Sequence, residues 1–469
     1  MVIGGGLAGL SSAVALADAG FRVRLFERRP FLGGRAASYD LPGGEHVDNC
    51  QHVTLGCCTN LSDFYRRVGA ERKIAFYDRL VFADSAGHRA VLQASPLPPP
   101  FHLAPALALY PFLTWAERHA IGHALMSIAR RGQRNADGDG AGVSMLDWLR
   151  RHGQTSASMD RFWRVVLVSA LNAELDRLDA RYGLDVFWKA FLSNRAGYRL
   201  GIPRVPLGEL YGGCRAAIER RGGEVTLRAP VRRVRVSDGR VAAVEMDTGQ
   251  DETAGIYVLA VPHDALLDLL PAQMTGEMAL FANLRRLRVS PITGVHFWFD
   301  RDVMAEPFLT ALDSTTQWIF NKSRLYGQPG GRYLQLVISA SDGLMPRSRQ
   351  EIIDLCLAEL RALLPATRQA SLVKATVVKE AAATFLPEPG SDRWRPSQRT
   401  PLPNLYLAGD WTETGWPATM EGAVRSGYLA AEAILAAAGS PRQLLLPDLP
   451  AEGLAPRLAS HVRRPWWPC

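Results

Sequence analysis

Apolar and polar positions change their spacing several times near the start of the chain, and each change marks an element. The apolar run Met1–Ile3 is followed by a glycine-rich turn and then by apolar residues at helical spacing. This pattern predicts a helix over Leu7–Asp18 that stops at Gly20. The stretch "FRVRLFE" alternates in polarity and predicts a second strand with Glu27 at its end. The predicted order is therefore strand, turn, helix, strand.

Strand patterns return in the second half of the chain. The alternating runs Glu224–Leu227, Val231–Val236 and Val241–Asp247 predict strands joined by tight turns. The continuous apolar run Ile256–Val261 predicts a buried strand. Close to the end, "NLYLAGDW" predicts another buried strand and "ATMEGAVRSGYLAAEAIL" predicts a helix. A second strand, loop and helix thus resemble the first.

The segments between these regions are richer in aromatic residues. "RFWRVVLVSALNAELD" and "GLDVFWKAFL" predict helices, whereas "TGVHFWFD" and "YLQLVISAS" predict strands. The proline-broken, very apolar segment Leu92–Trp115 is either a loop with a short helix or a surface patch where a lipid enters. The basic and aromatic ending "VRRPWWPC" would extend such a patch.

Composition narrows the class of protein only a little. The chain has 469 residues, enough for two or more domains, and a formal net charge of +8. That excess fits a solvated surface, or attraction to anionic lipid or an anionic cofactor. No aromatic-interleaved basic run indicates nucleic-acid binding, and the six cysteines fit no zinc pattern. With no secretory signal and no apolar run of ~20 residues, we expect a cytoplasmic protein without a metal.

Three glycines, Gly4, Gly6 and Gly9, form G-x-G-x-x-G after the first predicted strand. Gly4 permits the tight turn, Gly6 lets the backbone approach a pyrophosphate, and Gly9 lets the helix pack on the strand. Any glycine-rich turn can match this motif, but here a ribose-binding carboxylate, Glu27, also stands at the required spacing. It favours FAD or NAD over NADP. The contacts predicted here are Gly4, Gly6, Leu7, Ala8, Gly9, Glu27 and Arg28.

Further positions suit a longer cofactor. Gly34 and Arg35 follow the second strand, where the guanidinium can reach a pyrophosphate, although a single arginine can also be a surface cation. In folds that resemble this pattern a valine at the position of Val231 commonly brackets the adenine with its backbone, and Val231 can also be part of the core. Asp410, after Gly409 at the carboxyl end of a strand, is placed to hydrogen-bond a ribityl hydroxyl.

The last predicted helix separates FAD from NAD. Its N-terminal amides, near Met420 and Glu421, present positive partial charge, which suits the N1 and O2 atoms of a reduced flavin. Residues 409–427 contain no cysteine, so we expect non-covalent FAD. The contacts predicted in this half are Gly34, Arg35, Val231, Gly409, Asp410, Thr419, Met420 and Glu421.

In chain order, these motifs resemble the amine oxidase and phytoene desaturase group of FAD proteins. The segments Val47–Leu80 and Ile202–Tyr211, with "LNAELDRLDARYGLDVFWKAFL" and "GDWTETGWPATMEGAVRSG", are similar to its squalene-associated branch, the hydroxysqualene dehydroxylases of bacterial hopanoid synthesis. The resemblance implies an α/β fold, α+β overall. A Rossmann-like FAD-binding domain of the glutathione-reductase and amine-oxidase type would carry an interleaved mixed α/β substrate domain.

The resemblance also implies that both domains are discontinuous in sequence. The last predicted strand must return to the sheet of the first strand in order to close over the flavin. The expected FAD-binding domain comprises residues 1–75, 203–265 and 395–440, the substrate-binding domain comprises residues 76–202 and 266–394, and residues 441–469 form a C-terminal tail.

The implied reaction is reduction of hydroxysqualene, a C30 isoprenoid, to squalene with hydride from reduced FAD. An acid must protonate the leaving hydroxyl, and a long apolar substrate needs an apolar pocket. Each candidate could equally have a structural role. The candidate acids are Asp48, His52, Glu174 and Glu413, and the candidate pocket residues are Trp163, Trp188, Trp298, Trp411 and Trp416.

Residue types do not decide the direction of hydride transfer. A polyene desaturase of the phytoene type, passing hydride into oxidised FAD, is therefore the main alternative. An amine oxidase and a flavin-free prenyl-binding escort protein are weaker alternatives. The expected partners are a C30 isoprenoid, a membrane surface bound transiently, and, through functional coupling, the prenyl synthases of the squalene pathway. The expected location is the cytoplasm, with peripheral binding at the inner membrane.

Overall fold

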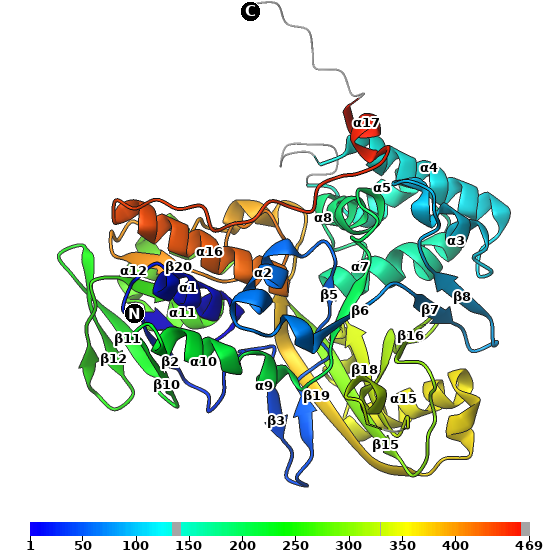
Figure 1. Cartoon of the computed structure of the whole chain (residues 1–469), viewed down its shortest axis with the longest axis horizontal. Coiled ribbons are helices and arrows are strands. Elements are labelled where there is room, and N and C mark those ends of the chain that lie inside the picture. The colour runs from blue at the N-terminus through cyan, green and yellow to red at the C-terminus, as the bar shows by residue number, and fades with distance from the viewer. Residues whose placement is uncertain (134–141, 329, 461–469) are drawn as a thin grey trace, which may run out of the picture.

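A five-stranded parallel sheet forms the centre of one half of the molecule (Figure 1). The computed structural model describes residues 1–133, 142–328 and 330–460. The strand order is β10-β2-β1-β14-β20. The strands come from distant parts of the chain: β1 (Val2–Ile3), β2 (Arg24–Glu27), β10 (Glu224–Leu227), β14 (Tyr257–Leu259) and β20 (Leu405–Leu407).

Both faces of this sheet are covered, as an all-parallel sheet requires. Adjacent residues such as Val2 and Ile3 belong to two different cores, because successive side chains of a strand point to opposite faces. One face packs against α1 (Leu7–Asp18), α10 (Gly212–Glu219) and α16 (Met420–Ala437). The other face packs against β11 (Val231–Ser237), β12 (Arg240–Met246), β13 (Asp251–Glu252), α11 (His263–Leu269), α12 (Ala272–Glu277) and α13 (Ala279–Leu284).

Helices α1 and α16 touch at backbone distance. A Cβ on Gly427 would lie 2.1 Å from Ser11 Oγ and 2.4 Å from Ala8 O, so only glycine fits at that point of α16. Ser11 Oγ also donates a hydrogen bond to Val424 O over 3.3 Å. This contact fixes the loop before α16 against the turn before α1. The two strand–loop–helix units of the sequence therefore become neighbours.

The other half of the molecule is built on a seven-stranded sheet, covered on one side by α15 (Arg349–Leu363). Its strand order is β19-β15-β18-β17-β16-β7-β8, mostly antiparallel, with one parallel pairing between β16 and β7. The long strands β15 and β19 pair along most of their length. The strands are β7 (Leu80–Ala83), β8 (Arg89–Leu92), β15 (Val289–Phe299), β16 (Phe308–Ala311), β17 (Trp318–Asn321), β18 (Tyr333–Ser339) and β19 (Leu372–Phe385).

A helical lobe packs beside this sheet, at the upper right of Figure 1. It contains α3 (Ala104–Ala108), α4 (Trp115–Arg131), α5 (Met145–Arg151), α7 (Arg164–Leu171) and α8 (Ala180–Val186), joined at the end of the described chain by α17 (Ala455–Ser460). Thr114 caps α4 through a capping box with Glu117. Small sheets link the halves: β3 (Ser38–Asp40) with β4 (His46–Asp48), and β5 (Thr54–Leu55) with β9 (Leu200–Pro203) and β6 (Ile74–Tyr77).

The predicted helices of the helical lobe are less regular than their patterns indicate. "RFWRVVLVSALNAELD" forms a π-helical turn, η3 (Met159–Trp163), and then α7, which ends at Asn172 in the left-handed region. "GLDVFWKAFL" begins in α8 and continues as a second π-helical turn, η4 (Phe187–Leu192). Apolar spacing does not distinguish α- from π-helical turns, because both bury bulky side chains on one face.

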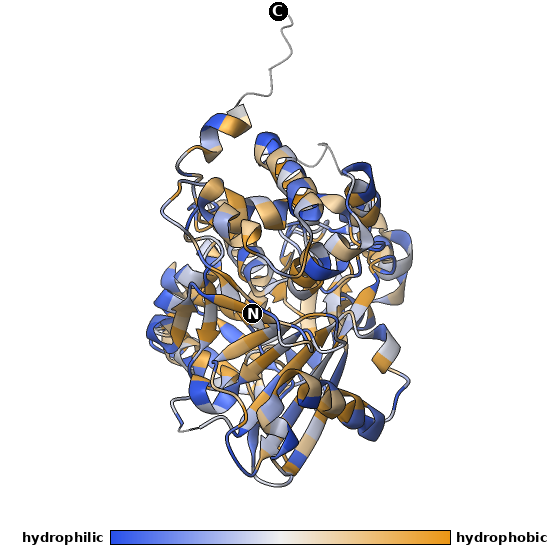
Figure 2. Ribbon diagram, turned by 90° about the vertical axis from the view of Figure 1, so that its right-hand side faces the viewer, coloured by the Kyte–Doolittle hydropathy of each residue, from blue (hydrophilic) through white to orange (hydrophobic). Residues whose placement is uncertain are grey.

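Strands from residues 1–75, 203–265 and 395–440 form the parallel sheet, and strands from residues 76–202 and 266–394 form the seven-stranded sheet. The exact domain boundaries remain predictions. Within the described ranges, no helix is both long enough and apolar enough to cross a membrane. Hydrophobic segments gather in the strands at the centre (Figure 2). The ending "VRRPWWPC" lies outside the described residues.

Candidate active site at the carboxyl ends of the parallel strands

A cavity of about 590 Å³ lies between the parallel sheet and the seven-stranded sheet. The turns that follow β1, β2, β14 and β20 all line it, as expected for a ligand site at the carboxyl edge of an open parallel sheet. The opposite wall comes from α7, β15, β18 and β19. The cavity is therefore formed by both halves of the molecule.

Close backbone contacts explain the glycine motif. Gly4 has φ +107°, and a Cβ there would lie 2.4 Å from Ala260 O. A Cβ on Gly9 would lie 2.0 Å from Gly4 O, so Gly9 lets α1 start directly against β1 although it does not line the cavity. A Cβ on Gly6 would meet only Gly34 Cα, at 3.9 Å. Gly6 thus leaves open space at the cavity wall.

That open space faces the start of α1. The N-cap residue Gly6 provides no side-chain cap, and the first turn of this 12-residue helix contains no acidic residue. Unpaired amides at a helix N-terminus carry positive partial charge and favour an anion such as a pyrophosphate. Leu7 and Ala8, in the same turn, also line the cavity.

Glu27 ends β2 and lines the cavity, where it is 6% exposed. Its two carboxylate oxygens accept hydrogen bonds from Gly5 N and Arg29 N, each over 2.7 Å. These backbone donors fix the carboxylate beside the glycine turn, where a ribose would lie. Arg28 is exposed where it lines the cavity, and Val231 lines the same cavity.

Arg35 and Asp410 form an ion pair across the cavity. Arg35 Nη2 lies 2.8 Å from both carboxylate oxygens of Asp410, and Nη1 donates to Ala383 O over 2.6 Å. Burial alone would lower the pKa of Arg35, but Asp410 outweighs it and raises the pKa. The sequence assigned these two residues to different parts of the cofactor, pyrophosphate and ribityl chain. The structure brings both to one point, where β20 meets β19.

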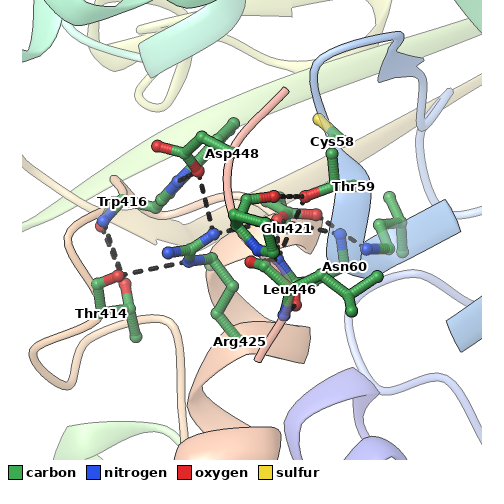
Figure 3. A network of polar contacts seen from close by, with 12 residues as sticks. Cys58, Thr59, Asn60, Thr414, Trp416, Glu421, Arg425, Leu446 and Asp448 are labelled. Atoms are coloured by element: carbon green, nitrogen blue, oxygen red, sulfur yellow. Dashed lines mark hydrogen bonds and ion pairs between the residues drawn. The ribbon is translucent and has the colours of Figure 1, made fainter. Parts of the chain in front are cut away.

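The loop before α16 completes the cavity. Gly409, Thr419 and Met420 line it, and Thr419 Oγ1 caps α16 by accepting from Gly422 N over 3.0 Å. Glu421 does not line it. Its carboxylate accepts from Asn60 Nδ2 over 2.9 Å and from Leu61 N over 2.7 Å, and so caps α2 (Thr59–Arg67) (Figure 3). The side chain of Glu421 is thus a helix cap and not a cavity residue.

These features fit an extended dinucleotide with a flavin ring. An uncapped helix end, a carboxylate for a ribose and a cavity that extends to the second strand–loop–helix match the phosphate, ribose and flavin parts of FAD in turn. Gly34, with φ +63°, lies where a Cβ would be 2.9 Å from Gly6 Cα, which keeps the two turns in contact.

Asp48 is a fixed carboxylate in the structure. It is 1% exposed and accepts hydrogen bonds from Lys322 Nζ, Tyr326 OH and Ser38 Oγ, each over 2.7 Å, and from Leu207 N over 2.9 Å. Burial alone would raise the pKa of Asp48, but Lys322 and these donors lower it to about 2. Such a group stays ionised at neutral pH and has no proton to give. Its placement argues against the predicted role as an acid.

His52 lines the cavity, and its Nδ1 lies 3.0 Å from Cys50 O. A hydrogen bond to that carbonyl requires a proton on Nδ1, which leaves Nε2 as an acceptor in the neutral ring. Burial lowers the pKa of His52 below its usual range. The structure therefore presents His52 as a neutral imidazole that can accept a proton.

The other two candidate acids lie away from the cavity. Glu174 forms a partly exposed ion pair with Arg164, with one oxygen 2.8 Å from Nε. Glu413 is exposed on the loop before α16. Neither lines the cavity, so the structure offers no support for them as catalytic acids. Sequence proximity to Asp410 was misleading for Glu413, because its side chain points outward from the loop.

Of the five candidate tryptophans, only Trp411 lines the cavity, where its Nε1 donates to Val261 O over 3.0 Å. Trp163 donates to Gln154 inside the helical lobe, and Trp188 is buried there too. Trp298 stacks on Tyr333 with ring centroids 4.6 Å apart. Trp416 donates to Asp448. None of these four lines the cavity, contrary to expectation, because they serve as packing and hydrogen-bonding residues.

Several polar residues of the site belong to no sequence motif. Gln51 lines the cavity and accepts from Lys322 Nζ over 2.7 Å, so the buried lysine links it to Asp48. Asn49 donates to Glu380 over 3.3 Å, and both line the cavity. The only sequence signal was the position of residues 49–51 in a segment similar to the squalene-associated branch. Glu380 lies on β19 and Lys322 begins the short helix α14 (Lys322–Leu325) directly after β17, and neither gave a signal in the sequence.

The fold and this site together define a flavin-dependent oxidoreductase with a dinucleotide-binding domain. The sequence profile of the family described as flavin containing amine oxidoreductase matches residues 7–435. The chain belongs to that family, whose cofactor is FAD.

The curated relatives are similar along nearly the whole chain. The 15-cis-phytoene desaturase of Synechococcus elongatus is 29% identical over 93% of this chain and 95% of its own length. The zeta-carotene desaturase of Synechocystis sp. is 28% identical, over 93% of this chain and 96% of its own length. The fold and the FAD cofactor are therefore shared with this family, whereas the substrates in these names are those of the relatives.

Solved structures show the same fold at lower identity. Putrescine oxidase bound to putrescine superposes with a TM-score of 0.70 at 17% identity, covering 93% of this chain and 98% of that chain. Cyclohexylamine oxidase from Brevibacterium oxydans gives 0.68 at 18% identity with the same coverage. An oxidoreductase from Methanosarcina mazei gives 0.68 at 18% identity, over 91% of this chain and 98% of that chain.

Proposed function

We propose that this protein is an FAD-dependent oxidoreductase that moves a hydride between FAD and a long acyclic isoprenoid, and that desaturation of a polyene is its best-supported reaction. Bound FAD supplies the hydride-accepting or hydride-donating N5 atom. The relatives that match end to end are named as desaturases of phytoene and zeta-carotene, which are acyclic polyenes. The cavity wall across from the glycine turn includes the apolar residues Ala170, Ile292 and Val337.

The observation that carries this proposal is the state of His52. Desaturation removes a hydride from one carbon and a proton from its neighbour, so the protein must accept a proton in the cavity. The neutral imidazole, held by Cys50 O through Nδ1, has Nε2 free for that proton. Ionised Asp48, bonded to Lys322, cannot supply a proton to a leaving group.

Reductive dehydroxylation of hydroxysqualene is the second candidate. The observation that favours it is the segment Val47–Leu80, which resembles the squalene-associated branch and supplies cavity residues 49–53. In this direction a hydride is added to the carbon and the hydroxyl leaves as water, so a proton must be delivered. His52 would have to begin the reaction protonated, and the reaction would then be faster at low pH.

Anaerobic incubations would separate the two reactions. FAD-loaded protein, oxidised or pre-reduced, is mixed with phytoene or with hydroxysqualene, and the products are identified by mass spectrometry. Desaturated products from phytoene with oxidised flavin support the first proposal. Squalene from hydroxysqualene with reduced flavin supports the second. In a third incubation, oxidation of an added primary amine by a protein that leaves both isoprenoids unchanged would contradict both.

We also propose that the segment Leu92–Trp115 meets a membrane surface. Leu97, Leu109 and Trp115 are exposed, and Leu109 is 80% accessible. The guanidinium of Arg118 lies 4.8 Å from the Trp115 ring centroid, a pairing that suits the boundary between apolar and anionic groups. Co-sedimentation with anionic vesicles should be lost in a Leu109→Ser, Trp115→Ser double variant. Cytoplasmic location with peripheral binding at the inner membrane, and coupling to prenyl synthases, remain predictions.

A further inference from the structure

A second cavity, of about 290 Å³, lies inside the helical lobe. Apolar side chains line it, among them Phe101, Leu103, Phe162, Phe187 and Phe191. The one hydroxyl in the lining, that of Tyr110, donates to Arg161 O over 2.8 Å and is therefore satisfied. Such a space favours a ligand without polar groups, because any polar group placed there would lose its hydrogen bonds to water.

One helix separates this space from the cofactor cavity. Val166 of α7 lines the second cavity, whereas Ser169 and Ala170, one turn later in the same helix, line the first. A hydrocarbon chain in the second cavity could therefore belong to a molecule whose reacting end lies in the first. It could also be an acyl chain from a membrane lipid, which has the same chemistry.

An extended segment after α16 leads from the cofactor half of the molecule to this lobe. Residues 440–452 form no helix or strand, and Figure 1 shows this part of the chain running back along α16 and on to α17 beside α4. We use "the strap" for residues 440–454. At its start, Glu432 Oε1 accepts from Leu444 N over 2.6 Å and from Leu445 N over 2.7 Å. Asn60 then bonds both backbone groups of Leu446 (Figure 3).

The far end of the strap holds the walls of the second cavity. Glu452 N donates to Ser193 O over 2.8 Å, and Asn194 Nδ2 donates to Pro450 O over 2.9 Å, directly after η4, whose Phe187 and Phe191 line the cavity. Leu454 N donates to Pro99 O over 2.8 Å, next to the lining residues Pro100 and Phe101. The strap therefore joins two walls that are far apart in sequence.

Asp448 is the central contact of the strap. Its Oδ1 accepts from Arg425 Nη1 over 3.0 Å and from Trp416 Nε1 over 3.1 Å (Figure 3). Its Oδ2 lies 3.1 Å from Lys189 Nζ and accepts from Gln133 Nε2 over 2.9 Å. Arg425 belongs to α16 and Lys189 to η4, so one carboxylate links the cofactor half to the cavity wall. All three charged side chains are at most 14% exposed, where salt screens little.

We propose that the strap is a latch that closes the second cavity over a hydrocarbon chain, and that Asp448 is the positioning residue that locks it. The chain that we assign to the cavity is the non-reacting end of the isoprenoid substrate, and this assignment rests on the proposed function. The latch itself does not rest on the proposed function, because it depends only on an apolar occupant and on the contacts of the strap.

An exchange measurement tests the latch in the full-length, FAD-loaded protein. The probe is diphenylhexatriene, an apolar fluorophore, whose dissociation is followed by stopped flow. In Asp448→Asn, Lys189 and Arg425 lose their shared anion, and we expect dissociation to be about tenfold faster or more, together with faster proteolysis of the strap. Flavin content should match the parent protein. Asp448→Glu should restore slow exchange.

The matched control is Asp300→Asn, which removes the same charge from a partly exposed pair with Arg301, directly after β15 and outside the strap contacts. It should leave probe exchange unchanged. If Asp448→Asn does not fold, Lys189→Gln removes the same ion pair from the η4 side and should give the same faster exchange of the probe. Unchanged exchange in a folded lock variant overturns the latch. So does a lock variant whose flavin loss accounts for all of the change, since that indicates a purely structural role.

A competition experiment shows whether the hydrocarbon chain in the second cavity comes from the isoprenoid substrate or from a membrane lipid. Displacement of the probe by squalene, but not by phosphatidylcholine vesicles, supports the substrate chain. Displacement by vesicles alone replaces the substrate with a lipid acyl chain, and displacement by neither overturns the hydrocarbon site. Normal exchange behaviour with no turnover of any isoprenoid would overturn the proposed function and leave the latch standing.

Discussion

The two cavities are built by opposite means. The first has backbone turns and charged groups at its walls: Gly4, Gly6, Glu27 and the Arg35–Asp410 pair. The second has apolar walls, and the charge that controls it, on Asp448, lies outside the cavity. Directional bonds fix the position of a ligand in the first, whereas only volume and shape can select one in the second. On the proposed function, the molecule would separate the chemistry of hydride transfer from the recognition of a long hydrocarbon chain.

The largest expected effect concerns the buried charge behind the first cavity. Lys322→Met removes the partner of Asp48, and both groups are fully buried. An unpaired buried carboxylate should lower the free energy of unfolding by about 3–5 kcal/mol, measured by urea denaturation. Burial lowers the pKa of Lys322 and Asp48 opposes this shift, so the pair depends on both members. Lys374→Met, which breaks the partly exposed pair with Glu45, should change stability little.

A smaller loss is expected where the backbone itself forms the cofactor cavity. Gly9→Ala places a Cβ 2.0 Å from Gly4 O, so α1 must move away from β1. We expect a loss of about 3 kcal/mol in FAD binding, or roughly a hundredfold in Kd, measured by flavin fluorescence titration. Gly212→Ala is the control, because a Cβ there meets nothing within 4 Å. Unchanged affinity in Gly9→Ala would show that this contact does not shape the site.

The difference between the cavities also explains what could be predicted from the sequence. Gly4, Gly9 and Glu27 are recognisable because backbone geometry leaves few alternatives at those positions. The bounds of α1 and β10 agree with the ranges expected from apolar spacing and from alternating polarity. Asp410 was found from its place after a buried strand, but its pairing with Arg35 joins residues 375 positions apart and left no local pattern.

The second cavity left no recognisable pattern in the sequence. Phe162 lines it, whereas its neighbour Trp163 lies outside, yet both look alike as large residues in a helical pattern. Which side of the helix meets a cavity depends on the π-helical turn η3, which apolar spacing does not reveal. The predicted acids also depend on three-dimensional surroundings. Asp48 and Glu413 are both carboxylic acids, but Asp48 is buried beside Lys322 and Glu413 is exposed on a loop.

Filling the second cavity should change substrate selection without touching the first. Ala129 is buried on α4 and lines the second cavity, so Ala129→Leu reduces the space for a chain. We expect KM for a C30 or longer isoprenoid to rise about tenfold, since misfit in an apolar pocket costs about 1–3 kcal/mol. FAD affinity should remain as in the parent. An equal rise for a short analogue that cannot reach the second cavity would show a general disturbance of the lobe.

The pH dependence of turnover should report the protonation of His52 at the first cavity. His52 accepts a proton in the proposed desaturation, and burial lowers its pKa below the ordinary value of 6.5. Because the neutral ring is the active form, kcat/KM should be flat at neutral pH and fall only below 6.5, as the ring becomes protonated. His52→Gln should keep FAD, lose most turnover and abolish this acidic limb. If activity instead rises as the pH falls through this range, His52 is a proton donor, and the reaction that fits the cavity is dehydroxylation rather than desaturation.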